Sequence, residues 1–116
     1  MRAATLFLAL LVPLAAQAAE KKALPAHGAI AYHRDSGSFG YAVDQPSSRA
    51  ARVEALRQCG DQRCEVVLRF RNDCGAVANG PKRYVASKGT TREEAQAKAL
   101  RSCGAGCSLV GWACTR

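Results

Sequence analysis

The 116-residue sequence lacks the motifs on which many hydrolases and nucleotide-binding enzymes depend. It has no His-Glu-x-x-His pair for zinc, no Gly-x-Ser-x-Gly nucleophile turn and no Gly-x-x-x-x-Gly-Lys phosphate loop. Its two histidines, His27 and His33, fall at the ends of a predicted hairpin, where we expect solvated rather than catalytic side chains. We therefore predict that the protein is not an enzyme and has no catalytic residues, cofactor or metal.

Carboxylates are scarce as well, with 9 Asp plus Glu against 17 Lys plus Arg. Asp35 and Asp73 lie in predicted turns, and Glu93 and Glu94 lie at a predicted helix start, so local structure accounts for each of them. No Cys-x-x-Cys pair stands at a helix N-terminus, where the helix dipole would lower the thiol pKa. Two catalytic functions are the alternatives to this non-enzymatic interpretation. One is a cell-wall hydrolase that uses Asp35, Asp73 or His33, and the other is a thiol-exchange protein.

The one long apolar run lies at the start of the chain. Arg2 precedes an apolar stretch over residues 3–15, and Ala16-Gln17-Ala18 is a small-x-small cleavage signal. Residues 1–18 are therefore predicted to be a signal peptide, because the run is too short for a membrane-spanning helix. Residues 19–26 are predicted to be a flexible lead-in. We expect an exported protein, periplasmic or secreted, with no integral membrane insertion after cleavage.

The rest of the chain contains one unit twice. Ala55 to Cys59 and Ala99 to Cys103 share the pattern Ala-Leu-x-x-Cys, and each is followed by glycine, a short loop and a second cysteine. Alternating apolar residues predict two strands before each helix and one after it. The order ββαβ over residues 27–71 and again over residues 72–116 predicts a single duplicated domain. Alanine-rich helix faces favour an α+β fold, with two helices packed on antiparallel strands in one sheet or two.

Side-chain patterns predict which faces meet in the first repeat. Gly40 and Ala42 leave room for a helix on one face of the second strand. The inner face of the first helix is predicted to consist of Ala51, Ala55, Leu56 and Cys59. The strand that follows is predicted to place Val66, Leu68 and Phe70 together on one face.

All six cysteines follow the predicted cleavage site, which favours disulfides formed in an oxidising compartment. The repeat narrows the fifteen possible pairings, because matched cysteines flank the turn after each helix. The predicted pairs are Cys59 with Cys64, Cys103 with Cys107 and, by elimination, Cys74 with Cys114. The alternative is a zinc site of four thiolates, since the spacings Cys-x4-Cys and Cys-x3-Cys are near those of zinc knuckles.

The formal net charge of +8 suggests an anionic partner. For an exported protein this is an anionic envelope polymer or an acidic protein rather than nucleic acid. Tyrosines beside basic residues favour a surface that stacks on and attracts a chain polymer. The alternative is that the tyrosines are core residues and that the charge is a solvated surface. The candidate binding surface comprises Tyr32, Arg34, Arg69, Arg71, Lys82 and Arg83.

These segments together resemble a known family of exported bacterial domains, domain of unknown function 4189. The resemblance rests on Gly28 to Tyr32, Gly37 to Tyr41, the two Ala-Leu-x-x-Cys helix ends, Cys74-Gly75-Ala76 and the closing Trp112-Ala113-Cys114. It implies export, an α+β domain and a cysteine framework, and it supplies no activity and no catalytic residue. We therefore expect a small exported, disulfide-stabilised interaction module.

Overall fold

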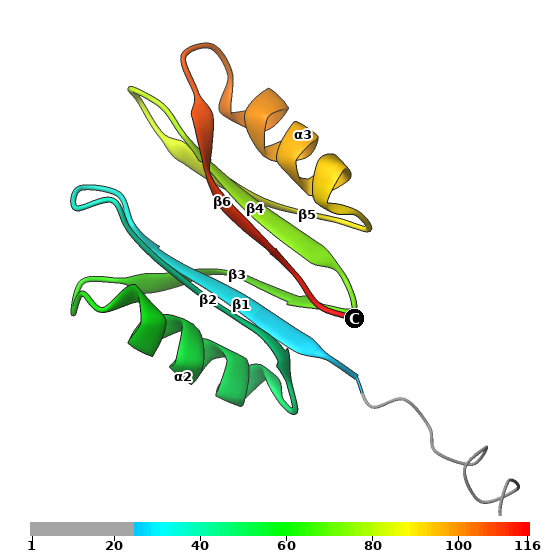
Figure 1. The fold of residues 1–116 in the computed structure, drawn as a ribbon. Helices are drawn as coiled ribbons and strands as arrows, with labels where there is room; N and C mark the ends of the chain where they lie inside the picture. Colours follow the sequence, from blue (N-terminus) through cyan, green and yellow to red (C-terminus); the bar gives the residue numbers. More distant parts are fainter. Residues whose placement is uncertain (1–24) are drawn as a thin grey trace, which may run out of the picture.

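The computed structural model describes residues 25–116 (Figure 1). The predicted signal peptide, residues 1–18, and most of the predicted lead-in, residues 19–26, lie outside the described residues. The elements are β1 (His27–His33), β2 (Ser38–Gln45), α2 (Ser48–Cys59), β3 (Glu65–Arg71), β4 (Cys74–Asn79), β5 (Tyr84–Gly89), α3 (Arg92–Cys103) and β6 (Ser108–Cys114). This is the predicted order ββαβ, repeated once.

The strands form two antiparallel sheets of three strands each. β1 is the central strand of the first sheet, between β2 and β3, and β4 is the central strand of the second, between β5 and β6. Figure 1 shows the sheets face to face, with α2 outside the first and α3 outside the second. The predicted α+β class is confirmed, and the question of one sheet or two is answered as two.

Both helices begin at residues suited to capping. The Ser47 hydroxyl accepts a hydrogen bond from the backbone N–H of Ala50 at 3.0 Å, and α2 ends at Gly60, whose φ of 73° is left-handed. The Thr91 hydroxyl accepts from the N–H of Glu94 at 3.1 Å. The Glu94 carboxylate accepts from both the N–H and the hydroxyl of Thr90, the residue before the N-cap Thr91, so Glu94 takes part in capping the start of α3.

Each helix packs closely on its own sheet through small side chains. A Cβ placed on Gly40 of β2 would collide with the backbone of Ala55 and Cys59, so the predicted helix-facing role of Gly40 is confirmed. Leu56, predicted to join the inner face, is instead 38% exposed. The reason is geometric, because Leu56 lies about 100° around the helix from Ala55 and the close approach buries only a narrow row. The buried helix residues are Ala51, Ala55 and Cys59 in α2, and Ala95, Ala99 and Cys103 in α3.

The inner faces of the two sheets enclose a second core layer. Ile30 of β1 and Val77 of β4 are fully buried there, and Phe70 packs in the same cluster. The ring of Phe39 fills the space that Gly111 leaves on the opposite sheet, since a Cβ on Gly111 would collide with that ring. Burial of apolar surface is the main favourable term in folding, so this layer is what joins the two repeats.

A one-residue bulge in the last strand of each repeat changes which side chains face the core. Val67 is the extra residue of β3 in its pairing with β1, and Val110 is the extra residue of β6 in its pairing with β4. A bulge shifts the alternation of faces by one residue. Val66 therefore packs towards α2, while Leu68 and Phe70 face the other sheet. The predicted shared face of these three residues is wrong for Val66.

Polar contacts connect the repeats at both ends of the sandwich. At the hairpin end, Arg34 donates from Nε to Oδ1 of Asn79 at 3.1 Å and from its terminal nitrogen to the carbonyl of Gly80 at 2.8 Å. At the other end, the N–H of Arg116 donates to Oδ1 of Asp44 at 3.1 Å. Within residues 25–116, no helix is both long and apolar enough to cross a membrane.

Candidate functional site

The cysteines form the three disulfides predicted from the repeat, and residues 25–116 contain no free cysteine. Two of them join a helix end to the next strand, and the third joins directly opposed residues of β4 and β6. The alternative zinc site would need four of these sulfurs as thiolates, so the pairing leaves no ligands for it. The pairs are Cys59–Cys64, Cys103–Cys107 and Cys74–Cys114.

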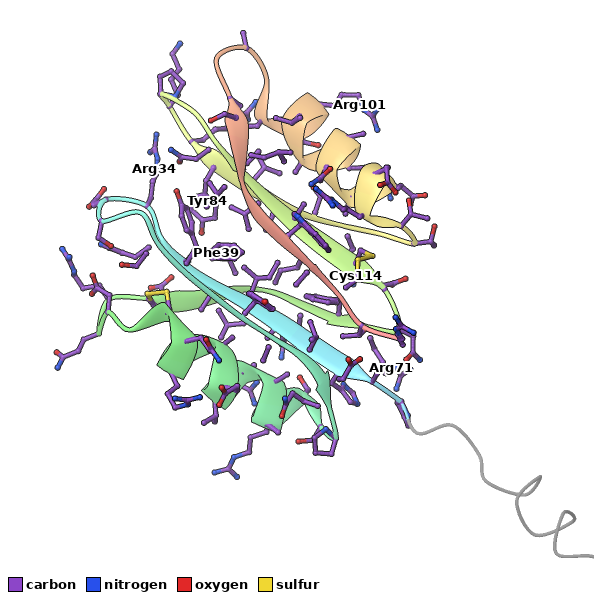
Figure 2. All side chains as sticks on the ribbon, in the orientation of Figure 1. Arg34, Phe39, Arg71, Tyr84, Arg101 and Cys114 are labelled. Carbon is purple, nitrogen blue, oxygen red and sulfur yellow. A yellow bond between two sulfur atoms is a disulfide. The ribbon has the colours of Figure 1, made fainter. Side chains whose placement is uncertain are left out.

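The six residues of the predicted binding surface do not form one surface. Tyr32 and Arg34 lie at the hairpin end of the sandwich, where Arg34 reaches the turn between β4 and β5. Lys82 and Arg83 belong to that turn and border a separate cavity at the end of α3. Arg69 and Arg71 lie at the far end of β3. Figure 2 shows Arg71 and Arg34 at opposite ends of the sandwich. Arg71 lies opposite His27 of β1, and His27 is five residues from Tyr32 along that strand, a distance of roughly 17 Å.

At the hairpin end, the candidate residues serve the structure. Tyr32 is buried and makes an edge-to-face contact with Tyr84 across the two sheets, with ring centroids 5.4 Å apart. Burial raises the pKa of Tyr32, the nearby Arg34 opposes this shift, and Tyr84 adds to it. The Arg34 guanidinium is already used in bridging to the second repeat. A cavity of about 540 Å³ opens here, with the Asp35 and Glu65 carboxylates in its lining.

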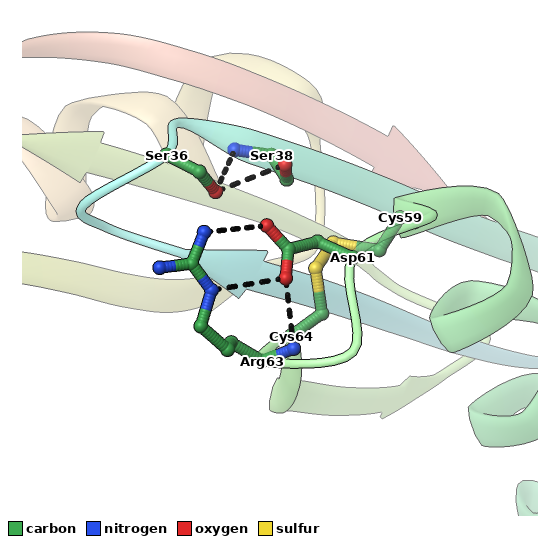
Figure 3. Close-up of a disulfide and its surroundings, with 6 residues drawn as sticks. All are labelled: Ser36, Ser38, Cys59, Asp61, Arg63 and Cys64. Atoms are coloured by element: carbon green, nitrogen blue, oxygen red, sulfur yellow. Dashed lines mark hydrogen bonds and ion pairs between the residues drawn. A yellow bond between two sulfur atoms is a disulfide. The ribbon is translucent and has the colours of Figure 1, made fainter.

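Arg63, the second arginine in the lining of this cavity, is neutralised by its neighbour. Arg63 donates to Asp61 from its backbone N–H at 2.9 Å, from Nε at 3.2 Å and from its terminal nitrogen at 3.0 Å (Figure 3). These bonds hold the pKa of Asp61 well below its usual range and raise the pKa of Arg63. Asp61 and Arg63 both lie in the turn that the Cys59–Cys64 disulfide closes, so this ion pair stabilises the turn.

Lys82 and Arg83 border a cavity of about 440 Å³ at the C-terminal end of α3. Arg83 donates from Nε to the carbonyl of Cys103 at 3.3 Å. A cation at this end complements the partial negative charge of the last helical carbonyls. Arg83 therefore acts as part of the helix end, and Lys82 is the freely exposed cation of this corner.

Arg69 and Arg71 line a third cavity, of about 500 Å³, together with Lys88 of β5 and His27 of β1. We call this cavity the cationic pocket; Ser48, Phe70 and Asp73 complete its lining. Within residues 25–116 the ion pairs are Arg57–Glu54, Arg63–Asp61 and Lys98–Glu94, so none of the three cations of the pocket has a carboxylate partner. Lys88 and His27 were not predicted as site residues. Lys88 reaches the arginines through the packing of β3 beside β5, and His27 lies opposite Arg71 in the pairing of β1 with β3.

A fourth cavity, of about 400 Å³, lies between β2 and β6 and has a different lining. Tyr41, Val43, Trp112, Ala113 and Cys114 line it, and none of these side chains is charged. Tyr41 is 47% exposed and Trp112 is 39% exposed. The guanidinium of Arg92 lies 4.1 Å from the centroid of the Trp112 ring, a cation–π contact that holds the indole. We call this cavity the aromatic pocket.

The cationic and aromatic pockets occupy equivalent places in the duplicated fold. Each lies between the last strand of one repeat and the second strand of the other, β3 with β5 and β6 with β2. Positions are matched by their register against the central strands β1 and β4. The equivalent residues are Arg69 and Trp112, and Arg71 and Cys114. Duplication has thus produced two copies of one pocket with different chemistry.

A family model described as "Domain of unknown function (DUF4189)" matches residues 27–114. The chain belongs to the DUF4189 family. The match spans both repeats and all three disulfides, so the whole duplicated sandwich is the DUF4189 domain. The family that the sequence resembles is therefore confirmed, and its description names no activity.

Relatives of this DUF4189 chain occur in Mycobacterium tuberculosis. It is 42% identical over 88 residues to the uncharacterized protein Rv1813c, covering 76% of this chain and 59% of Rv1813c. It is 39% identical over 88 residues to protein Rv1269c, covering 76% of this chain and 68% of that protein. The NMR structure of Rv1813c matches with a TM-score of 0.62 and 36% identity, covering 81% of this chain and 78% of that one. The match thus spans 59% of the length of full Rv1813c, and it supports the fold described above.

Proposed function

We propose that this DUF4189 domain is an exported, non-catalytic binding module that takes an anionic envelope polymer at the cationic pocket. The observation that carries the proposal is the grouping of Arg69, Arg71 and Lys88 around one cavity, without a carboxylate paired to any of them. Like charges held together raise the electrostatic energy of the free protein, and an anion that enters the pocket relieves it.

The chemistry of the pocket suits phosphate or carboxylate groups along a chain. A guanidinium offers a planar pair of donors that matches either group in a bidentate contact. Arg69 and Arg71 are two residues apart on β3, so both lie on one face of the strand, about 7 Å from each other. Asp73 also lines the pocket, which leaves an excess of positive charge.

The pocket is held rigid by the fold around it. Lys88 lies on β5 opposite Gly75 of β4, next to the Cys74–Cys114 disulfide. Because the walls come from β3 and β5, the pocket exists only when the two sheets are packed. A site that is ordered before binding loses less conformational entropy on binding. Three disulfides in a domain of this size are typical of chains that fold in an oxidising compartment, which supports export.

The hydrolase and thiol-exchange alternatives find less support. Asp35 lines the cavity at the hairpin end and Asp73 lines the cationic pocket at the opposite end, so the two carboxylates do not meet. His33 lines the hairpin-end cavity together with Asp35, but its buried Nε2 atom has no hydrogen-bond partner among the described residues, so no carboxylate orients the imidazole. Thiol exchange would begin from an accessible thiolate, whereas the six cysteines are paired.

The test is binding of the oxidised chain to immobilised polyphosphate, a polyanion without sugar rings. We expect retention that falls steeply with salt, because each phosphate contact releases counterions. Arg69→Gln, Arg71→Gln and Lys88→Gln should each weaken binding by roughly tenfold at low salt. Arg101→Gln is the matched control, since it removes one exposed cation from α3, far from Arg71 in Figure 2.

The controls also decide between outcomes. An equal loss in Arg101→Gln would show that net charge alone drives retention, and the pocket would then have no special role. Retention that does not change with salt would remove the electrostatic proposal. Tighter binding to poly-glutamate than to polyphosphate would point instead to an acidic protein as the partner. Circular dichroism on each variant establishes that the fold is intact.

A further inference from the structure

We infer that the aromatic pocket is a second, independent binding site, which takes a neutral pyranose ring of a glycan. This inference does not rest on anion binding at the cationic pocket. The lining of the aromatic pocket contains no charged side chain, and the aromatic pocket lies on the opposite edge of the sandwich. Its volume of about 400 Å³ falls within the range of small-molecule sites, about 300–1,000 Å³.

The duplicated fold provides an internal control for its two aromatic residues. The position of Tyr41 is occupied in the second repeat by Ala86, and the position of Trp112 is occupied in the first by Arg69. The architecture therefore forms without an aromatic ring at either place. By contrast, Phe39 and its equivalent Tyr84 are both aromatic, as expected for a position that the sheet packing requires.

The solvent exposure of the two aromatic side chains also indicates a binding role. Tyr41 and Trp112 come from different sheets, yet they line the same cavity and each leaves more than a third of its surface in solvent. Isolated exposed apolar residues are common on proteins, whereas two large rings around one cavity mark a binding site. The Arg92 guanidinium covers part of the indole and fixes it, so a ligand meets a ring that is already ordered.

The polar groups at this place suit hydroxyls. β2 and β6 are both edge strands, so their outer backbone N–H and C=O groups have no strand partner within residues 25–116. A pyranose ring has an apolar C–H face, which stacks on aromatic rings, and a rim of hydroxyls, which both donate and accept hydrogen bonds. The pocket offers rings and backbone groups side by side. Its lining residues are uncharged, and the neighbouring Arg92 guanidinium is stacked on the indole.

An extended peptide added to the same edge fits less well. Strand addition needs a regular run of backbone groups. The bulge at Val110 interrupts the run on β6, and Asp44, with φ of 55°, interrupts it at the end of β2. The regular stretch left on β6 is short, so the two edges do not offer a continuous pair of runs, which favours a compact ring over a strand.

The experiment titrates the oxidised chain with two neutral oligosaccharides, chitotetraose and cellotetraose. Trp112 is the single tryptophan of the chain, so its fluorescence reports directly on this pocket. We expect a saturable change in emission with at least one sugar, and saturation-transfer NMR signals from the sugar C–H protons. Tyr41→Ala keeps the reporter and should weaken binding by about tenfold, while Tyr41→Phe keeps the ring and should retain most of it.

The control for a general effect of exposed apolar surface is Val53→Ala, which changes an exposed residue of α2 outside the pocket and should leave binding unchanged. The inference is overturned if neither sugar changes the emission, or if Tyr41→Ala binds as well as the unchanged protein. It is also overturned if only sulfated oligosaccharides bind and Arg71→Gln abolishes that binding. Failure of the polyphosphate experiment would leave these results unaffected, so the two proposals fail separately.

Discussion

The two repeats share one backbone and differ in what they present. In the first repeat the last strand offers Arg69 and Arg71, and in the second the same positions hold Trp112 and Cys114. What both repeats retain is the alanine row of the helix, the bulge in the last strand and the glycine after the helix. The comparison separates two kinds of residue: those that both copies need to fold, and those that each copy is free to use for binding.

The repeats also differ in how they are closed. The first sheet ends with His27 opposite Arg71, whereas the second ends with Cys74 opposite Cys114, joined by a disulfide with Cα atoms 4.0 Å apart. The first repeat has one disulfide and the second has two. The second repeat is thus more strongly cross-linked, and this difference gives the largest expected effect.

Removal of the Cys74–Cys114 disulfide should cost more stability than removal of the Cys59–Cys64 disulfide. The loop-entropy relation assigns about 4 kcal/mol to a bridge that spans 40 residues and about 2 kcal/mol to one that spans 5. Urea denaturation of Cys74→Ala/Cys114→Ala and of Cys59→Ala/Cys64→Ala measures both. Equal losses would mean that native-state packing, rather than loop length, sets the contribution of each bridge.

A methyl group added at the helix–sheet contact should have the next largest effect. Gly40→Ala places a Cβ against the backbone of Cys59, and Gly89→Ala places one against the backbone of Ala95. Because the backbone atoms that the new methyl group meets cannot rotate away, each substitution should lower the free energy of unfolding by about 1–3 kcal/mol. Gly37→Ala is the control: a Cβ there meets no atom within 4 Å, and only its φ of 76° opposes it, at about 1 kcal/mol. A smaller loss at Gly40 than at Gly37 would contradict the close approach of α2.

The smallest expected difference is in the pH response of the two helix starts. Hydrogen bonds from the Thr90 N–H and hydroxyl, with Lys98 nearby, lower the pKa of Glu94. A carboxyl group whose pKa is lowered by folding stabilises the folded state at any pH above the pKa of that group in the unfolded chain, about 4.3 for glutamate. This stabilisation is lost as the pH falls through the pKa of the group in the folded state. The first turn of α2 contains no acidic residue. Acid should therefore loosen the start of α3 selectively.

Amide protection factors, measured between about pH 6 and about pH 3, test this response. We expect the amides after Thr91 to lose protection and those after Ser47 to keep theirs. Glu94→Gln should make the start of α3 insensitive over the same range. A parallel loss at both helix starts would instead indicate general acid unfolding.

Local signals in the sequence predicted much of the fold. Ser47, Thr91 and Gly60 mark helix ends with side chains and conformations that act within a few residues, and the repeat itself restricted the cysteine pairing. The bulge at Val67 escaped prediction because one extra valine in an apolar strand leaves the composition unchanged. Leu56 escaped because helical spacing does not show how wide the buried row will be.

The candidate site was harder to predict than the fold. Arg69 and Arg71 were identified from their charge, but Lys88 reaches them only because the two sheets pack face to face, which brings the edge strand β3 beside the edge strand β5. Tyr41 and Trp112 are 71 positions apart in the chain and meet for the same reason. No spacing rule connects residues across two stacked sheets, so both pockets required the tertiary arrangement.

The Cys74–Cys114 bond also determines how the chain carries tension. A pull applied on either side of the domain passes from Cys114 through sulfur to Cys74, so the segment between these cysteines bears no load. Of the elements in residues 25–116, those along the stressed path are β1, β2, α2 and β3. Under mechanical stretching the first half would unravel while the second stays closed as a loop. Both pockets would open together, because β2 supplies one wall of the aromatic pocket and β3 one wall of the cationic pocket.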